Sequence, residues 1–232
     1  MRPESVTTCA PFVAPNGSPA VDRIAHRAGN SRRALQLAIE AGVDWIEIDV
    51  WYSYGRLIAR HEWGVWRVPL VYDRGRLHVL RHRLIDLEDV IRLTEGGPRL
   101  FIDLKGAHRR LPGAIIRALR KNDAADRAAV CGQHWPPLDA IAEAEPRIEI
   151  FHSLGRPEHL EAYAAREHDR LVPAGISIAR SLITPELVEN FHKQERKLFA
   201  WTVNDWEQAS QLAAWRVDGI ISDRLDLLAA LA

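Results

Sequence analysis

Short apolar runs separated by amphipathic stretches recur along the chain from residue 21 onward. Runs such as Ile24-Ala25 and Arg99–Lys105 are brief and mostly apolar, which is typical of buried strands. In Ser31–Ala41 the apolar residues have helical spacing instead, with Ser31 as a candidate N-cap and Gly42 as the terminating residue. The hydrophobic pattern therefore predicts strands that alternate with helices.

The alternation continues to the end of the chain. The predicted strands are Arg23–Arg27, Asp44–Trp51, Arg99–Lys105, Ala128–Gly132, Arg147–Ser153, Ala174–Ala179, Lys197–Val203 and Val217–Ser222. The predicted helices are Ser31–Ala41, Ile85–Leu93, Leu111–Lys121, Leu138–Glu143, Pro157–Arg166, Thr184–Lys193, Asp205–Ala214 and Arg224–Ala230. Strict alternation implies a parallel sheet.

Eight such units within about 210 residues indicate an α/β fold of the (β/α)₈ TIM-barrel type, as a single domain over residues 21–232. An open doubly wound sheet is the alternative, but it gives no reason for polar groups at the ends of nearly all strands. Residues 1–20 are predicted to form a loose N-terminal tail. After a turn at Tyr54-Gly55, Arg56–His61 is predicted to return as a short extension. Residues 62–84 are the least regular part, with a candidate hairpin over Leu70–Leu80 and an aromatic cluster that forms either a packed loop or one wall of a pocket.

Composition narrows the class of protein. The chain has 232 residues, of which 47% are hydrophobic and 27% charged, and its 31 Lys and Arg balance its 31 Asp and Glu. This balance favours neither nucleic acid nor an anionic membrane surface as a partner. Two cysteines, Cys9 and Cys131, provide neither a disulfide framework nor a zinc pattern. Since no apolar run resembles a signal peptide or a membrane span, we expect a cytoplasmic protein without stable membrane insertion.

Ionisable residues interrupt the first apolar runs. Glu47 and Asp49 lie two residues apart on a predicted strand, so both side chains point to the same face. Two like charges on a buried face repel each other unless a cation lies between them. A divalent metal with oxygen ligands is the simplest explanation, and His26 and His61 flank the pair as groups that can move protons.

In a TIM barrel, functional groups lie at the C-terminal ends of the strands. The residues at or just after these ends are His26, Arg27, Glu47, Asp49, Asp103, Lys105, His134, Ser153, Arg180, Asn204 and Asp223. The apolar pattern alone predicts these strands, so the position of the polar residues at their ends supports the barrel.

These motifs resemble those of the glycerophosphodiester phosphodiesterases. Six family motifs have counterparts here, in the same order. The family motifs are His-Arg-Gly, Gly-x-Asp-x-Ile-Glu-x-Asp-Val, His-Asp, Glu-x-Lys, Trp-Thr-Val-Asn and Asp-Gly-Ile-x-Thr-Asp. Their counterparts in this chain are, in turn, His26-Arg27-Ala28-Gly29, residues 42–50, His61-Glu62, Asp103-Leu104-Lys105, residues 201–204 and residues 218–223. The resemblance spans about residues 23–230 and implies a TIM barrel that hydrolyses phosphodiesters with a divalent cation, Mg²⁺ or Ca²⁺.

The resemblance also implies roles for single residues. Glu47, Asp49 and Asp103 would bind the metal, His26 and His61 would be the general acid and base, and Arg27 and Lys105 would hold the phosphate. Arg27 and Lys105 have a second interpretation as ion-pair partners of neighbouring carboxylates. Trp201 either stacks on the substrate or plugs the mouth of the barrel.

Three positions depart from the family pattern. Asn30-Ser31-Arg32-Arg33 stands where the family has Pro-Glu-Asn-Thr, and Glu62 replaces the Asp after the second histidine. Asp103 replaces a Glu, which resembles the related sphingomyelinase-D/phospholipase-D branch.

The sequence therefore favours a phosphoric diester hydrolase that cleaves glycerophosphodiesters to glycerol 3-phosphate and an alcohol. A lysophospholipase D or sphingomyelinase-D-like lipid phosphodiesterase is one alternative, and a non-catalytic barrel that binds phosphorylated ligands is another. The expected partner is accordingly a small-molecule or lysolipid phosphodiester, and no feature of the sequence specifies an oligomeric state.

Overall fold

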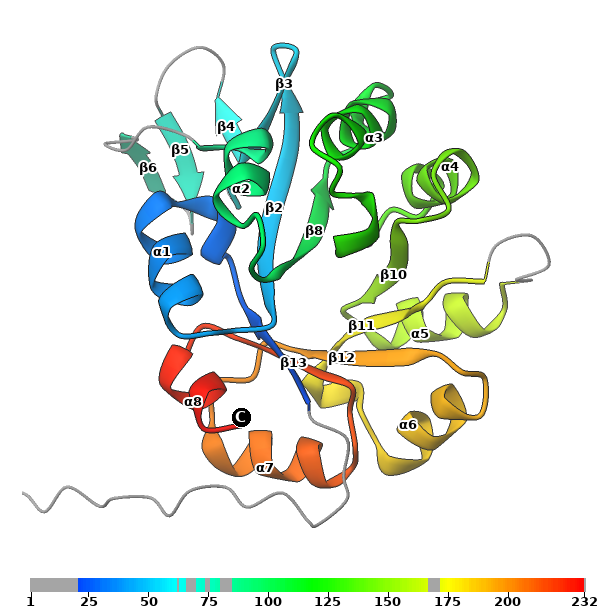
Figure 1. Ribbon diagram of the computed structural model, residues 1–232. Helices are drawn as coiled ribbons and strands as arrows, with labels where there is room; N and C mark the ends of the chain where they lie inside the picture. The colour runs from blue at the N-terminus through cyan, green and yellow to red at the C-terminus, as the bar shows by residue number, and fades with distance from the viewer. Residues whose placement is uncertain are drawn as a thin grey trace, which may run out of the picture.

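The computed structural model describes residues 21–61, 63–65, 70–73, 76–79, 85–166 and 172–231, so the predicted tail at 1–20 lies outside the described residues. Within these ranges eight parallel strands close into a barrel, and the helices form a ring around it (Figure 1). In order around the barrel the strands are β1 (Asp22–Ala25), β2 (Trp45–Ser53), β8 (Arg99–Lys105), β9 (Ala128–Gly132), β10 (Glu149–Leu154), β11 (Gly175–Ala179), β12 (Lys197–Trp201) and β13 (Gly219–Ser222). The barrel closes because β1 pairs in parallel with both β2 and β13. The predicted TIM barrel is confirmed.

A helix follows each barrel strand, as the sequence pattern predicts. The α-helices are α1 (Arg32–Glu40), α2 (Leu87–Leu93), α3 (Leu111–Lys121), α4 (Pro136–Ala144), α5 (Pro157–Ala164), α6 (Pro185–His192), α7 (Trp206–Ala214) and α8 (Leu225–Ala229). The predicted N-cap is present, since the Ser31 side chain accepts a hydrogen bond from the Ala34 amide. Thr184, the first residue of a predicted helix, caps α6 in the same way by accepting from the Leu187 amide. Gly42, just after α1, has a φ of 65°, a conformation that glycine adopts without strain.

The helix predicted over Ile85–Leu93 begins later than expected. Ile85-Asp86 forms the short strand β7, which pairs antiparallel with β3 (Arg56–Ala59). Asp86 then has an extended backbone at the N-cap of α2. The buried Ile85 side chain satisfies a strand and a helix equally well, so the apolar spacing did not distinguish the two.

The predicted extension and hairpin are also present. β3 pairs antiparallel with β2 across the turn at Tyr54-Gly55, and β5 (Leu70–Asp73) pairs antiparallel with β6 (Arg76–Val79). A third strand, β4 (Trp63–Val65), adds to this hairpin and makes a small separate sheet (Figure 1). The side chains of the aromatic cluster and of Glu62 lie outside the described residues.

Four aromatic side chains fill the interior of the barrel. Trp45, Phe101, Phe151 and Phe199 are at most 1% exposed and pack with ring centroids 4.6 to 6.1 Å apart. They come from strands β2, β8, β10 and β12, of which β2 and β8 are neighbours, and together they form an apolar layer across the barrel. This layer fills the interior of the barrel. Side chains two residues further toward the C-terminal ends of the strands therefore lie at the mouth, above an apolar floor.

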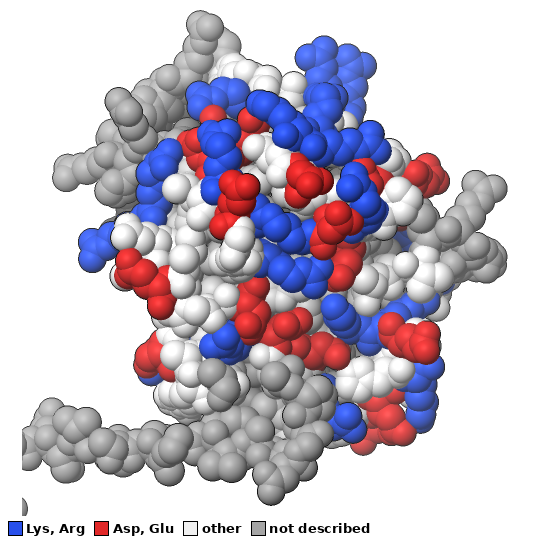
Figure 2. Space-filling view, viewed as in Figure 1, with Lys and Arg blue, Asp and Glu red and all other residues white. Residues whose placement is uncertain are grey.

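The outer surface is of mixed charge. On the face shown in Figure 2, Lys and Arg are intermixed with Asp and Glu, and basic side chains are denser over α2 and α3. None of the helices in the described part of the chain combines the length and the apolar character that crossing a membrane requires.

Candidate active site

Three carboxylates meet at the mouth of the barrel. Glu47 and Asp49 extend from β2, and Asp103 extends from β8 at the position paired with Asp49. One oxygen from each lies within 4.8 Å of the others. Glu47 is 4% exposed and Asp49 is 1% exposed, so water screens their repulsion poorly. Such a cluster needs positive charge close by.

Lys105 supplies that charge. Its Nζ lies 2.9 Å from Asp49 Oδ1 and also donates to Asp103 Oδ2. Burial alone would lower the pKa of Lys105, but the two aspartates outweigh burial and raise it. Burial would likewise raise the pKa of Asp49, but Lys105 and a hydrogen bond from Asn30 outweigh it and lower that pKa. Burial dominates at Asp103 and raises its pKa. The ion-pair interpretation of Lys105 therefore describes its contacts in this structure.

Glu47 is held differently from the two aspartates. Burial, reinforced by the charges of Asp49 and Asp103, raises the pKa of Glu47 well above its usual value. Its Oε2 accepts a hydrogen bond from the backbone N–H of Arg27. Arg27 has a left-handed backbone, with φ 55° and ψ 13°. Its guanidinium Nε lies 3.8 Å from Asp49 Oδ2, a weak ion pair at a side chain that is 40% exposed.

The turn after β1 brings an amide group to Asp49. Asn30 Nδ2 donates to Asp49 Oδ2 at 2.6 Å, and Asn30 Oδ1 accepts from the Asp49 amide at 3.0 Å. The turn lies tightly against β2, since a Cβ at Gly29 would come within 2.2 Å of Ile48 Cγ1. Asn30 is where the sequence departs from the Pro-Glu-Asn-Thr pattern, and here it fixes the orientation of a carboxylate.

His26 has a carboxylate partner of its own. Its Nδ1 lies 2.7 Å from Asp223 Oδ1, and Asn204 Nδ2 donates to Asp223 Oδ2 at 2.7 Å. Burial lowers the pKa of His26, and the hydrogen bond with Asp223 opposes this shift. Ser222 Oγ in turn donates to Asn204 Oδ1 at 3.0 Å. The imidazole therefore has one defined orientation.

The eight site residues predicted from the sequence all line one cavity of about 180 Å³. They are His26, Arg27, Glu47, Asp49, His61, Asp103, Lys105 and Trp201. The other lining residues include Cys131, Gln133, Ser153 and Ser177. Asn30 and Asp223, which contact Asp49 and His26, carried no predicted role. The only signal for Asp223 was its position after a strand end, and the only signal for Asn30 was its place in the segment that departs from the family pattern.

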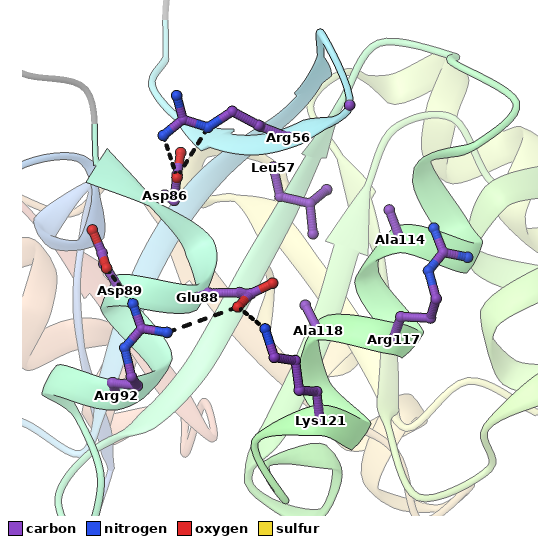
Figure 3. A pocket seen from close by; sticks show the side chains of 11 residues that line it. Arg56, Leu57, Asp86, Glu88, Asp89, Arg92, Ala114, Arg117, Ala118 and Lys121 are labelled. Atoms are coloured by element: carbon purple, nitrogen blue, oxygen red, sulfur yellow. Dashed lines mark hydrogen bonds and ion pairs between the residues drawn. The ribbon is translucent and has the colours of Figure 1, made fainter.

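A larger cavity, of about 430 Å³, lies outside the barrel between β3, α2 and α3 (Figure 3). Its charged side chains mostly pair with one another. Glu88 contacts both Lys121 and Arg92, and Asp86 contacts Arg56. In these surface ion pairs the positive and negative side chains neutralise each other, so little net charge remains to attract a ligand. The smaller cavity, with its clustered carboxylates and histidines, is the better candidate active site despite its size.

The carboxylate cluster fits a hard divalent cation. Oxygen donors are the ligands that Mg²⁺ and Ca²⁺ prefer, and the three carboxylates offer them within a few ångströms of one another. Two of the three have raised pKa values, for which burial is the first cause. Such groups gain most when a cation offsets their mutual repulsion.

Comparison with known proteins identifies the class. Residues 103–227 match the model of the glycerophosphoryl diester phosphodiesterase family. A glycerophosphodiester phosphodiesterase of Caldanaerobacter subterraneus subsp. tengcongensis is 26% identical over 230 residues, which cover 86% of this chain and 93% of that protein. The fold matches a glycerophosphodiester phosphodiesterase of Agrobacterium tumefaciens, with a TM-score of 0.72, 19% identity and coverage of 90% of this chain and 99% of that one. It also matches an Oleispira antarctica phosphodiesterase in complex with the product sn-glycerol-3-phosphate, with a TM-score of 0.72, 19% identity and coverage of 92% and 97%.

Fold and family together define a phosphoric diester hydrolase built on a TIM barrel. The chain belongs to the glycerophosphoryl diester phosphodiesterase family, because the family model matches more than half of it.

Replacing Lys105 tests the electrostatic balance of the site. In Lys105→Met, Asp49 and Asp103 lose their buried cation, so we expect a loss of about 3 kcal/mol in the free energy of unfolding near pH 7 in EDTA. Without Lys105 the folded-state pKa of Asp49 should rise above its unfolded value, and that of Asp103, which burial already raises, should rise further. The protonated carboxyls then favour the folded state, and the deficit should narrow as the pH falls toward about 4.

The measurement is urea unfolding of wild type and variant at several pH values. Lys121→Met, at a lysine that is 67% exposed and paired with Glu88, is the matched control and should cost little. A deficit for Lys105→Met that does not depend on pH would contradict this account.

Proposed function

We propose that this protein is a metal-dependent phosphodiesterase that hydrolyses glycerophosphodiesters to glycerol 3-phosphate and an alcohol. The observation that carries the proposal is that two buried carboxylates and one half-buried carboxylate, two histidines and the cationic side chains of Arg27 and Lys105 line one small cavity at the barrel mouth. Hydrolysis of a phosphodiester needs stabilisation of an anionic transition state and two proton transfers, and these residue types supply both.

Glu47, Asp49 and Asp103 would hold the divalent cation, Mg²⁺ or Ca²⁺. When bound, it supplies Lewis-acid stabilisation of negative charge on the phosphoryl oxygens. Arg27 and Lys105 line the same cavity and carry positive charge that a phosphate attracts. Lys105 would then share its ammonium between the aspartates and the substrate.

His26 and His61 would transfer the protons. If Nδ1 of His26 donates to Asp223, then Nε2 is left without a proton and can accept one. The lowered pKa of His26, caused first by burial, keeps the imidazole neutral near pH 7, as a base requires. This geometry favours His26 as the base and His61 as the acid, and we propose Asp223 as a positioning residue for His26.

Two further observations support a small diester as the substrate. The product named with the Oleispira antarctica structure is sn-glycerol-3-phosphate. The cavity of about 180 Å³ is smaller than the roughly 300 Å³ at which sites for drug-sized ligands begin, so it suits a polar head group better than an enclosed acyl chain. The comparisons give no support to the lipid phosphodiesterase or to the binding-only barrel.

The direct test is hydrolysis of glycerophosphocholine beside lysophosphatidylcholine, first in EDTA and then with added Mg²⁺ or Ca²⁺. We expect release of glycerol 3-phosphate from the small diester only when metal is present. Turnover of the lysolipid alone would transfer the assignment to the phospholipase-D branch. Ligand binding without turnover of either compound would favour the non-catalytic barrel.

Replacing Asp49 tests the metal assignment. Asp49→Asn preserves shape but removes a charged ligand, so we expect activity to fall at least about 100-fold and the affinity for divalent cation to fall with it. Calorimetric titration of the metal and circular dichroism separate lost binding from lost folding. Asp226→Asn, at a surface carboxylate paired with Arg224, should change neither. Full activity of Asp49→Asn in EDTA would refute the assignment.

Replacing Asp223 tests the role of its contact with His26. The carboxylate of Asp223 raises the pKa of His26, so Asp223→Asn should lower that pKa. The limb of the pH profile of kcat/KM that reports His26 should then move to lower pH, and kcat/KM should fall about tenfold or more. Asp205→Asn is the control, because Asn also caps a helix well. An unchanged pH profile would show that Asp223 does not act through His26.

A further inference from the structure

Two serines with little overall exposure line the same cavity as the carboxylates. Ser153 is 6% exposed and Ser177 is 2% exposed, and both line the cavity at the barrel mouth. They occupy paired positions on the neighbouring strands β10 and β11. Paired residues on adjacent strands lie about 5 Å apart. The two hydroxyls are therefore close enough to act on one ligand.

The two serines lie across the barrel from the residues of the carboxylate cluster. In the ring order β1, β2, β8, β9, β10, β11, β12, β13, strand β11 lies across the barrel from β2, and β10 lies across from β1. Ser177 therefore belongs to the wall that faces Glu47 and Asp49, and Ser153 to the wall that faces His26. A molecule whose phosphate was held at the charged wall could reach the serines with one of its ester arms.

Neither hydroxyl has a hydrogen-bond partner among the described residues of the chain. The third buried serine, Ser222, shows the contrast, because its Oγ donates to Asn204 Oδ1 and accepts from the Arg224 amide. Neither Oγ is among the buried side-chain atoms that lack a partner, so both hydroxyls are open to the cavity and can bond to a ligand there. A hydroxyl group of a ligand can both donate to and accept from each of them.

Apolar aromatic rings lie beneath the two serines, on the side toward the barrel interior. Phe151 precedes Ser153 by two residues on β10, and Phe199 is paired with Ser177 across β11 and β12. Their rings stack with centroids 4.6 Å apart and close the barrel beneath the hydroxyls. Trp201, two residues beyond Phe199, lines the same cavity, and its buried indole Nε1 also has no hydrogen-bond partner. Such a site places a few polar groups on an apolar floor, which favours a short polyol over a hydrocarbon chain.

We propose that Ser153 and Ser177 form a subsite that hydrogen-bonds the hydroxyl groups of the polyol arm of the substrate and selects it against unhydroxylated diesters. The proposal rests on the proposed phosphodiesterase function and assigns its specificity to these two residues. Each hydroxyl can donate one hydrogen bond and accept others, so the pair can satisfy two adjacent hydroxyl groups. A site built in this way rejects an analogue that lacks the hydroxyls, because its own polar groups are then left unpaired.

The test is a double-mutant cycle between enzyme and substrate. The probes are 2,3-dihydroxypropyl 4-nitrophenyl phosphate and propyl 4-nitrophenyl phosphate, assayed with added divalent metal. Wild type should prefer the dihydroxypropyl diester at least about tenfold in kcat/KM. The variant carrying both Ser153→Ala and Ser177→Ala should lose that preference while it hydrolyses the propyl diester as well as wild type. Ser181→Ala, at an exposed serine, should retain the preference.

Two outcomes would overturn the subsite: a preference that survives in the double variant, or an equal loss of activity on both diesters. If wild type hydrolyses neither diester with any metal, the proposed function fails separately. Calorimetry with glycerol 3-phosphate and propyl phosphate then decides the subsite alone. Tighter binding of glycerol 3-phosphate by wild type but not by the double variant would support it, and equal affinities in wild type would refute it.

Discussion

The repulsion among three carboxylates at the barrel mouth is the constraint to which the rest of the site responds. Glu47, Asp49 and Asp103 are brought together by the pairing of β2 with β8, which is fixed by a continuous parallel register. Burying such charges without compensation would cost several kcal/mol for each ion. The protein offsets this cost with the ammonium of Lys105 and with hydrogen bonds from the turn that contains Asn30. A divalent cation would meet the same requirement, which is why the cluster suits one.

The barrel determines where that constraint can be placed. Its interior is filled by aromatic rings, so polar side chains can reach a cavity only at the layer above them. Side chains alternate between the inside and the outside of the barrel, so residues two apart on a strand both face inward. One strand can therefore supply a side chain to the aromatic floor and another to the polar mouth. β10 contributes Phe151 to the floor and Ser153 to the mouth, and β12 contributes Phe199 and Trp201 in the same way. The mouth is consequently asymmetric, with charge at β1, β2 and β8 and neutral polar groups across from it.

Much of the fold was predictable because its signals are local. Spacing of two residues placed Glu47 and Asp49 on one face, and the caps at Ser31 and Thr184 marked helix starts. Contacts between distant segments were not predictable in the same way. The hydrogen bond between His26 and Asp223 joins residues 197 positions apart, and the pairing of Ser153 with Ser177 depends on strand register, which no single segment encodes.

Lys105 links the stability of the site to its chemistry. Lys105 could offset the charge of the carboxylates from a position outside the cavity. Instead its side chain lines the cavity and remains partly exposed, where a ligand could contact it. A phosphate that entered would bring further negative charge beside three carboxylates, and Lys105 and Arg27 supply only two positive charges, so a divalent cation would be needed to accommodate it. Arg27 is only weakly paired with Asp49 and would be the more available of the two side chains. Under the proposed function Lys105 would be shared between the carboxylates and the phosphate, whereas Arg27, whose ion pair is longer, would be freer to contact the phosphate.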